Sequence, residues 1–196
     1  FGVLPAKTAV AQSYGHPLVL LLLGGFLLSK GMEKSGVHRR IALGMVRACG
    51  GSGGKGLILG FMLASATLSM WISNTATTMM LLPVGMAVVA QVARQSTLNG
   101  RQDEFSERQV IESMGLVLML GLAYSASIGG VGTLIGTAPN IVVAGFYKNL
   151  YPENPEISFV EWMIMAIPVV IIFIPIVWIY LCKFVSPIPL NQIEFA

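Results

Sequence analysis

Residues 56 to 93 form an uncharged segment that is too long for a single membrane crossing. Lys55 is the last charged residue before it and Arg94 is the first after it. At about 1.5 Å per residue, one straight helix over this span would far exceed a hydrocarbon core of roughly 30 Å. The segment must therefore turn back or break. A polar tripeptide, Ser73-Asn74-Thr75, lies between its two apolar arms and predicts a helical hairpin with a polar tip.

The composition is typical of a membrane protein. Apolar residues make up 55% of the chain and charged residues 11%, against about a quarter charged in an ordinary soluble domain. Lys and Arg gather in residues 30–55 and 94–108, whereas the loop 148–161 is mainly acidic, so the first two regions are expected in the cytoplasm and the third outside. The net charge of +3 therefore indicates topology and not nucleic-acid binding.

These patterns predict an all-α polytopic protein of the cell (inner, cytoplasmic) membrane, and we expect the chain to be part of a longer multi-pass protein. Five segments are predicted. The first, residues 1–50, contains a spanning helix that begins within 16–29 and an amphipathic helix along the cytoplasmic interface in 30–50. The hairpin (51–94) and a cytoplasmic loop (95–108) follow. The fourth segment (109–150) is a spanning helix broken at 129–140, and the fifth (151–196) contains an external loop, a spanning helix over 159–182 and a cytoplasmic tail.

The hairpin tip and the Gly-rich break GGVGTLIGTAPN are the candidate binding sites. Irregular backbone at membrane depth occurs only where it is buried in protein or lines an aqueous cavity. The helix that enters a break leaves free carbonyl oxygens, which suit a small hard cation, and the helix that leaves it presents N–H groups, which suit an anion. Transporters with discontinuous helices use this arrangement.

Particular side chains agree with a cation site and an anion site. Ser69 precedes Ser73 by one helical turn, so both hydroxyls can face one cation with the amide oxygen of Asn74. Thr75 is placed to cap the second arm. In the break, Pro139 suits the first turn of the resumed helix, which puts Thr137 and Ala138 at its entry and leaves an unhindered carbonyl at Gly136. Neither break contains Lys or Arg, which predicts cation-coupled anion binding.

Each feature also has a purely structural interpretation. A Ser-Asn-Thr turn is a common capping arrangement, and a Gly-rich break is often only a kink. Two breaks in one short uncharged region favour a transport site. No intramembrane acid, base or nucleophile constellation is found, so no enzyme is predicted, and Cys49 and Cys182 lack the spacing of metal ligands.

Three stretches resemble the divalent anion/sodium symporters, the family of sodium-coupled dicarboxylate and citrate transporters. SNTATTMMLLP (73–83) resembles the family's first Ser-Asn-Thr motif at the tip of a re-entrant hairpin. SIGGVGTLIGTAPN (127–140) is similar to its partner loop, and GFLLSKGMEKSGVHRRIAL (25–43) to its third helix and following interfacial helix. The resemblance covers nearly all of the chain but only the first of the family's two inverted repeats.

The resemblance implies a sodium site formed by Ser69, Ser73, Asn74 and the Gly136 carbonyl. It also implies substrate contacts from Asn74, Thr75, Thr137 and Ala138. The hairpin and the broken helix would move together as a transport domain in an elevator-type mechanism. Helices 16–29 and 159–182 would belong largely to the scaffold and dimer side of a homodimer.

The function expected from these patterns is sodium-coupled symport of a dicarboxylate such as succinate, malate or fumarate. The second inverted repeat would supply the rest of the site, so we expect this segment alone to transport nothing. Two alternatives remain open: a sodium-independent dicarboxylate exchanger on the same scaffold, and a membrane anchor or assembly subunit whose breaks only aid packing.

Overall fold

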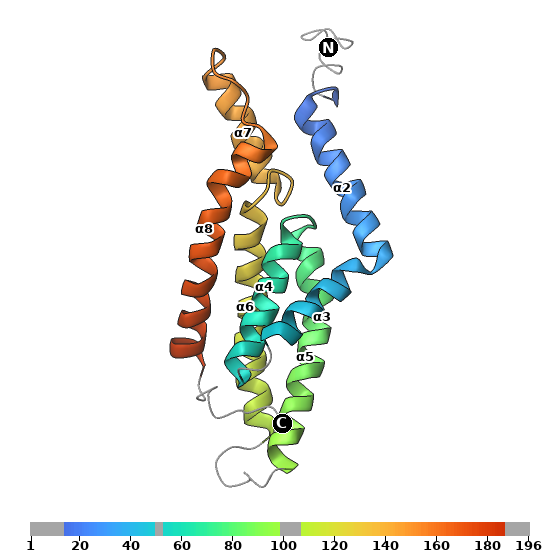
Figure 1. Ribbon diagram of the computed structural model, residues 1–196, viewed down its shortest axis with the longest axis vertical. Coiled ribbons are helices and arrows are strands. Elements are labelled where there is room, and N and C mark those ends of the chain that lie inside the picture. Colours follow the sequence, from blue (N-terminus) through green and yellow to red (C-terminus); the bar gives the residue numbers. More distant parts are fainter. Residues whose placement is uncertain (1–13, 50–52, 99–106, 187–196) are drawn as a thin grey trace, which may run out of the picture.

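The computed structural model describes residues 14–49, 53–98 and 107–186, which form the elongated bundle of helices in Figure 1. No strand occurs within these three ranges, so the predicted all-α fold is confirmed for them. The helices are α2 (Pro17–Ser35), α3 (Val37–Cys49), α4 (Gly53–Ser69), α5 (Asn74–Leu98), α6 (Glu107–Val131), α7 (Ala138–Leu150) and α8 (Phe159–Tyr180), which continues into the π-helical turn η2 (Leu181–Val185).

Helices α4 and α5 are the two arms of a hairpin that turns at residues 70–73 (Figure 1). Helix α6 packs against both arms, so the central unit is a three-helix cluster rather than an isolated pair. Its core is almost entirely aliphatic and Met-rich. For a chain expected in a membrane, whose lipid is as apolar as these side chains, close van der Waals packing is the main source of stability. The largest fully buried side chains are Ile58, Phe61, Met62, Leu68, Val89, Met114, Val117, Leu118, Leu122, Leu134 and Leu181.

Glycines let α6 approach the hairpin closely. A Cβ placed on Gly129 would overlap the backbone carbonyl of Ala66 in α4, and a Cβ on Gly85 of α5 would lie 2.5 Å from Leu118 Cδ2. Helix α6 therefore continues through Gly129 and ends at Val131, and only residues 132–137 leave the helix. The predicted break at 129–140 was too wide, because its first glycines are used for packing and not for breaking the helix.

The boundary between α2 and α3 also differs from the prediction. Gly36 adopts the left-handed conformation (φ 68°) and its N–H donates to the Glu33 carbonyl, which ends α2 at Ser35. The amphipathic segment therefore begins as a separate helix at Val37 and not at residue 30. The predicted loop 95–108 is likewise shorter, since α5 continues to Leu98 and α6 begins at Glu107.

Helix α8 is attached to the hairpin cluster at both of its ends. The indole of Trp162 donates to the Val131 carbonyl (2.9 Å), and the indole of Trp178 donates to the Lys55 carbonyl (3.0 Å). Leu181 and Cys182 of η2 are buried in the same core. The helix is otherwise exposed along an apolar face that includes Val160, Ile164, Ile171, Phe173 and Ile176. Among the described residues, two segments, Ile111–Val131 and Phe159–Val185, are long and apolar enough to cross a membrane.

The glycine contact between α6 and α4 predicts a large effect of a single methyl group. We expect Gly129→Ala to destabilise the protein by about 3 kcal/mol or more, because relief of the overlap requires a shift of the backbone. The matched control is Gly31→Ala in α2, where a Cβ meets no described atom within 4 Å. Thermal unfolding of the purified full-length protein distinguishes them, and equal melting temperatures would show that the helices tolerate a wider separation.

Candidate functional site

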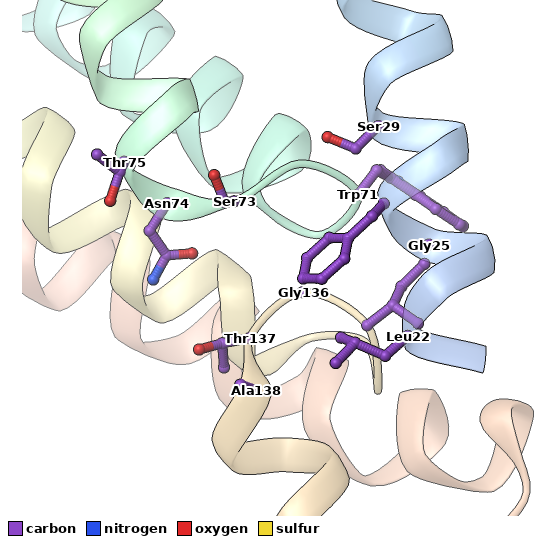
Figure 2. Close-up of a pocket in the computed structure, with 12 residues that line it drawn as sticks. Leu22, Gly25, Ser29, Trp71, Ser73, Asn74, Thr75, Gly136, Thr137 and Ala138 are labelled. Atoms are coloured by element: carbon purple, nitrogen blue, oxygen red, sulfur yellow. The ribbon is translucent and has the colours of Figure 1, made fainter. Parts of the chain in front are cut away.

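The hairpin tip and the break between α6 and α7 meet at one cavity of about 300 Å³, which α2 closes on a third side (Figure 2). Its polar lining comes from the two irregular segments and its apolar lining largely from α2 and its neighbours. The lining residues are Leu22, Gly25, Phe26, Ser29, Trp71, Ser73, Asn74, Thr75, Ile135, Gly136, Thr137 and Ala138. None of these twelve side chains is ionisable, so the cavity carries no fixed charge.

All four predicted substrate contacts, Asn74, Thr75, Thr137 and Ala138, line this cavity. Thr137 stands at the N-cap position of α7 in an extended conformation, but its hydroxyl makes no capping hydrogen bond. Pro139 occupies the first turn of α7, as expected. The structure therefore brings the predicted anion-binding residues of two distant segments together, with the Thr137 hydroxyl available to a ligand.

Three of the four predicted cation ligands, Ser73, Asn74 and Gly136, also line the cavity, whereas Ser69 lies behind Asn74. Ser69 is completely buried, and its hydroxyl donates to the amide oxygen of Asn74 at 2.6 Å. Within the described part of the chain, no donor reaches the Gly136 carbonyl. The site thus contains the amide oxygen of Asn74, which the Ser69 hydroxyl holds in place, and the carbonyl oxygen of Gly136, which accepts no hydrogen bond from the described residues.

The start of the second arm differs from the prediction in one residue. Helix α5 begins at Asn74, and the Ser73 hydroxyl accepts the N–H of Ala76 at 3.3 Å. Ser73, and not Thr75, therefore caps the arm. Thr75 does not cap the helix, and its side chain is exposed in the cavity.

The expectation of free carbonyls at the end of α6 was wrong for four residues. The Gly129 carbonyl accepts the N–H of Gly132, and the Val131 carbonyl accepts the indole of Trp162. The remaining two, at Gly130 and Thr133, accept the side-chain amide of Asn140. Buried carbonyls need partners, and here the protein supplies them, so none of these four oxygens is free for a ligand.

Several residues at the site carry no recognisable sequence signal. Ser29 lies in an apolar run, where a small polar residue of a helix gives no sign of a binding role. The wall that α2 forms depends on how this helix packs against the hairpin tip and the break. Gly25 lines the cavity as well, and a Cβ there would lie 3.1 Å from Ile135 Cβ. Asn140 could have been suspected only from its place directly after Pro139.

Comparison with known proteins identifies the family of this chain. The family model described as CitMHS, citrate transporter, matches residues 1–191. The chain is 39% identical to the sodium-dependent dicarboxylate transporter SdcS of Staphylococcus saprophyticus and 40% identical to that of Staphylococcus aureus, over 172 residues in each case. The match covers 88% of this chain and 31% of either relative, so the chain spans less than a third of their length. The predicted resemblance is confirmed, and the chain belongs to the citrate transporter family and is a membrane protein.

Proposed function

We propose that this chain forms one half of a secondary transporter that couples sodium to the uptake of a dicarboxylate such as succinate, malate or fumarate. The observation that carries the proposal is the uncharged cavity in which two helix breaks meet. The relatives named for sodium and dicarboxylates support this ion and substrate. The family description names citrate, and the 39–40% identity to dicarboxylate transporters favours the smaller anion.

In this proposal Na⁺ binds to Ser69, Ser73, Asn74 and the Gly136 carbonyl, and a substrate carboxylate binds to Asn74, Thr75, Thr137 and Ala138. Asn74 belongs to both sets. Because the cavity has no basic side chain, the bound cation offsets the charge of the carboxylate, and each ligand raises the affinity for the other. This reciprocal effect is the physical basis of coupling. A binding site with its own Lys or Arg would not require a bound cation to hold the carboxylate.

The arrangement in the membrane is part of the same proposal. Helices α4 and α5 form a re-entrant hairpin, and α3 lies along the cytoplasmic interface of the cell membrane. Ile41 and Met45 of α3 pack against the core, while Arg40 and Arg47, seven residues apart, are exposed toward anionic headgroups. A second inverted repeat completes the site in a multi-pass homodimer. The contacts of Trp162 and Trp178 favour an α8 that moves with the hairpin in an elevator-type step, and not with the scaffold.

The first prediction concerns Asn74. In liposomes containing the full-length protein, Asn74→Ala is expected to reduce sodium-driven succinate uptake by about tenfold to a hundredfold, because both ligands lose a hydrogen-bonding or coordinating group. Uptake is measured with and without an inward sodium gradient, and an excess of citrate as competitor tests the choice of substrate. Undiminished sodium-driven uptake by the variant would remove the hairpin tip from the site.

The second prediction separates ion binding from stability with two buried serines of α4. The Ser69 hydroxyl holds Asn74, whereas the Ser65 hydroxyl donates to the Leu122 carbonyl at 3.0 Å, away from the cavity. Ser69→Ala is expected to weaken the apparent sodium affinity by about tenfold, and Ser65→Ala should lower stability by roughly 1 kcal/mol without that shift. Equal sodium affinities in the two variants would contradict the assignment of Ser69.

The third prediction addresses coupling. Symport requires that uptake cease when sodium is replaced by choline, and that internal dicarboxylate not substitute for the gradient. Counterflow that persists without sodium, and that is insensitive to Ser73→Ala, would identify an exchanger on the same scaffold. Folded protein with neither uptake nor any sodium-dependent or substrate-dependent stabilisation would identify an anchor or assembly subunit.

A further inference from the structure

A single hydrogen bond joins the two irregular segments directly. The hydroxyl of Thr133, in the break after α6, donates to the carbonyl of Met70 at 2.5 Å, across 63 residues of sequence. Met70 follows the last residue of α4, so its carbonyl is one of those that a helix end leaves without an intrahelical partner. Thr133 is completely buried. The bond therefore satisfies the end of the first arm and ties the hairpin tip to the break.

Asn140 fixes the other side of Thr133. Its side-chain amide donates to the Thr133 carbonyl at 2.7 Å and to the Gly130 carbonyl at 2.8 Å, and the residue is only 5% exposed. One amide in the first turn of α7 thus holds the last turn of α6 and the loop between the two helices. The connection runs from Asn140 through Thr133 to Met70, and none of these three residues lines the cavity.

The same network sets the position of the proposed cation ligands. Asn74 Oδ1 lies 2.6 Å from the point where a Cβ of Gly130 would be, and Gly136 packs its Cα side against the Gly130 carbonyl. Asn74 belongs to the hairpin tip and Gly136 to the break (Figure 2). A shift of the tip relative to the break would separate the two oxygens. The Thr133 hydrogen bond and the glycine contacts oppose such a shift, in addition to the packing of α4 and α5 against α6.

We propose that Thr133 and Asn140 are positioning residues that hold the tip and the break in register, so that both halves of the cation site are formed before the ion binds. The identity of the ion as sodium rests on the proposed function. All the bonds of the network are internal to the protein, so it can act without a ligand. If only a fraction of the molecules held the tip and the break in register, the apparent affinity for the cation would fall in proportion to that fraction.

The test compares Thr133→Val with Thr133→Ser in the full-length protein. Valine keeps the shape of threonine but leaves the Met70 carbonyl without a donor, whereas serine retains the hydroxyl. Thermal stabilisation by NaCl, with choline chloride at equal ionic strength as control, is expected to require about tenfold more sodium in Thr133→Val and a nearly unchanged concentration in Thr133→Ser. Asn140→Leu removes both donors on α7 without adding a charge and is expected to shift the titration in the same direction.

A second measurement does not depend on sodium. Thr75→Cys places a thiol on the exposed part of the tip, and its rate of reaction with a maleimide is measured without sodium in each background. We expect faster labelling with Thr133→Val and Asn140→Leu than with Thr133→Ser. Equal labelling rates, together with unshifted sodium titrations, would overturn the positioning role. A native protein that does not respond to sodium would refute the proposed ion, and the labelling rates would still decide whether the network holds the tip.

Discussion

The close contact between α6 and the hairpin is the constraint on which the rest of the structure depends. Gly129 lies against the Ala66 backbone, Gly130 lies against the Asn74 amide, and Gly136 lies against Gly130. A side chain at any of these positions would separate the hairpin tip from the break, because close-packed interiors absorb added volume only by moving backbone. The absence of side chains at these three residues is therefore what allows two irregular segments to share one cavity.

Such close approach would be costly if the exposed backbone groups lacked partners, since a buried carbonyl without a hydrogen bond loses a substantial part of its solvation. The protein meets this need with side chains from three separate elements: Thr133 from the break, Asn140 from α7 and Trp162 from α8. The open Gly136 carbonyl and the unused Thr137 hydroxyl then stand out as the groups left for a ligand. The lining has no charge of its own, so the anion and the cation of the proposed function would depend on each other.

Much of the local structure followed from the sequence. The uncharged stretch between Lys55 and Arg94 required a turn, and the polar tripeptide at its centre located the hairpin tip to within a few residues. Pro139 predicted the restart of the helix after the break, because its missing N–H is harmless only in a first turn. The candidate residues Asn74, Thr75, Thr137 and Ala138 were identified as helix-end groups, and all of them line the cavity.

Tertiary structure decided the helix boundaries and which hydrogen-bond donor each carbonyl at the break receives. The sequence pattern of Gly129 and Gly130 predicts a helix break, yet both residues are helical, and their missing side chains make room for Ala66 of α4 and Asn74 of α5. The α6 carbonyls that appeared free accept the N–H of Gly132 and the side-chain N–H groups of Asn140 and Trp162, and the α2 wall of the cavity arises from helix placement. The sequence by itself determined that the uncharged segment must turn and which polar residues lie near the turn and the break, since these follow from charge and local propensity. Which exposed groups stay open to a ligand depended on contacts between distant segments, which no local pattern encodes.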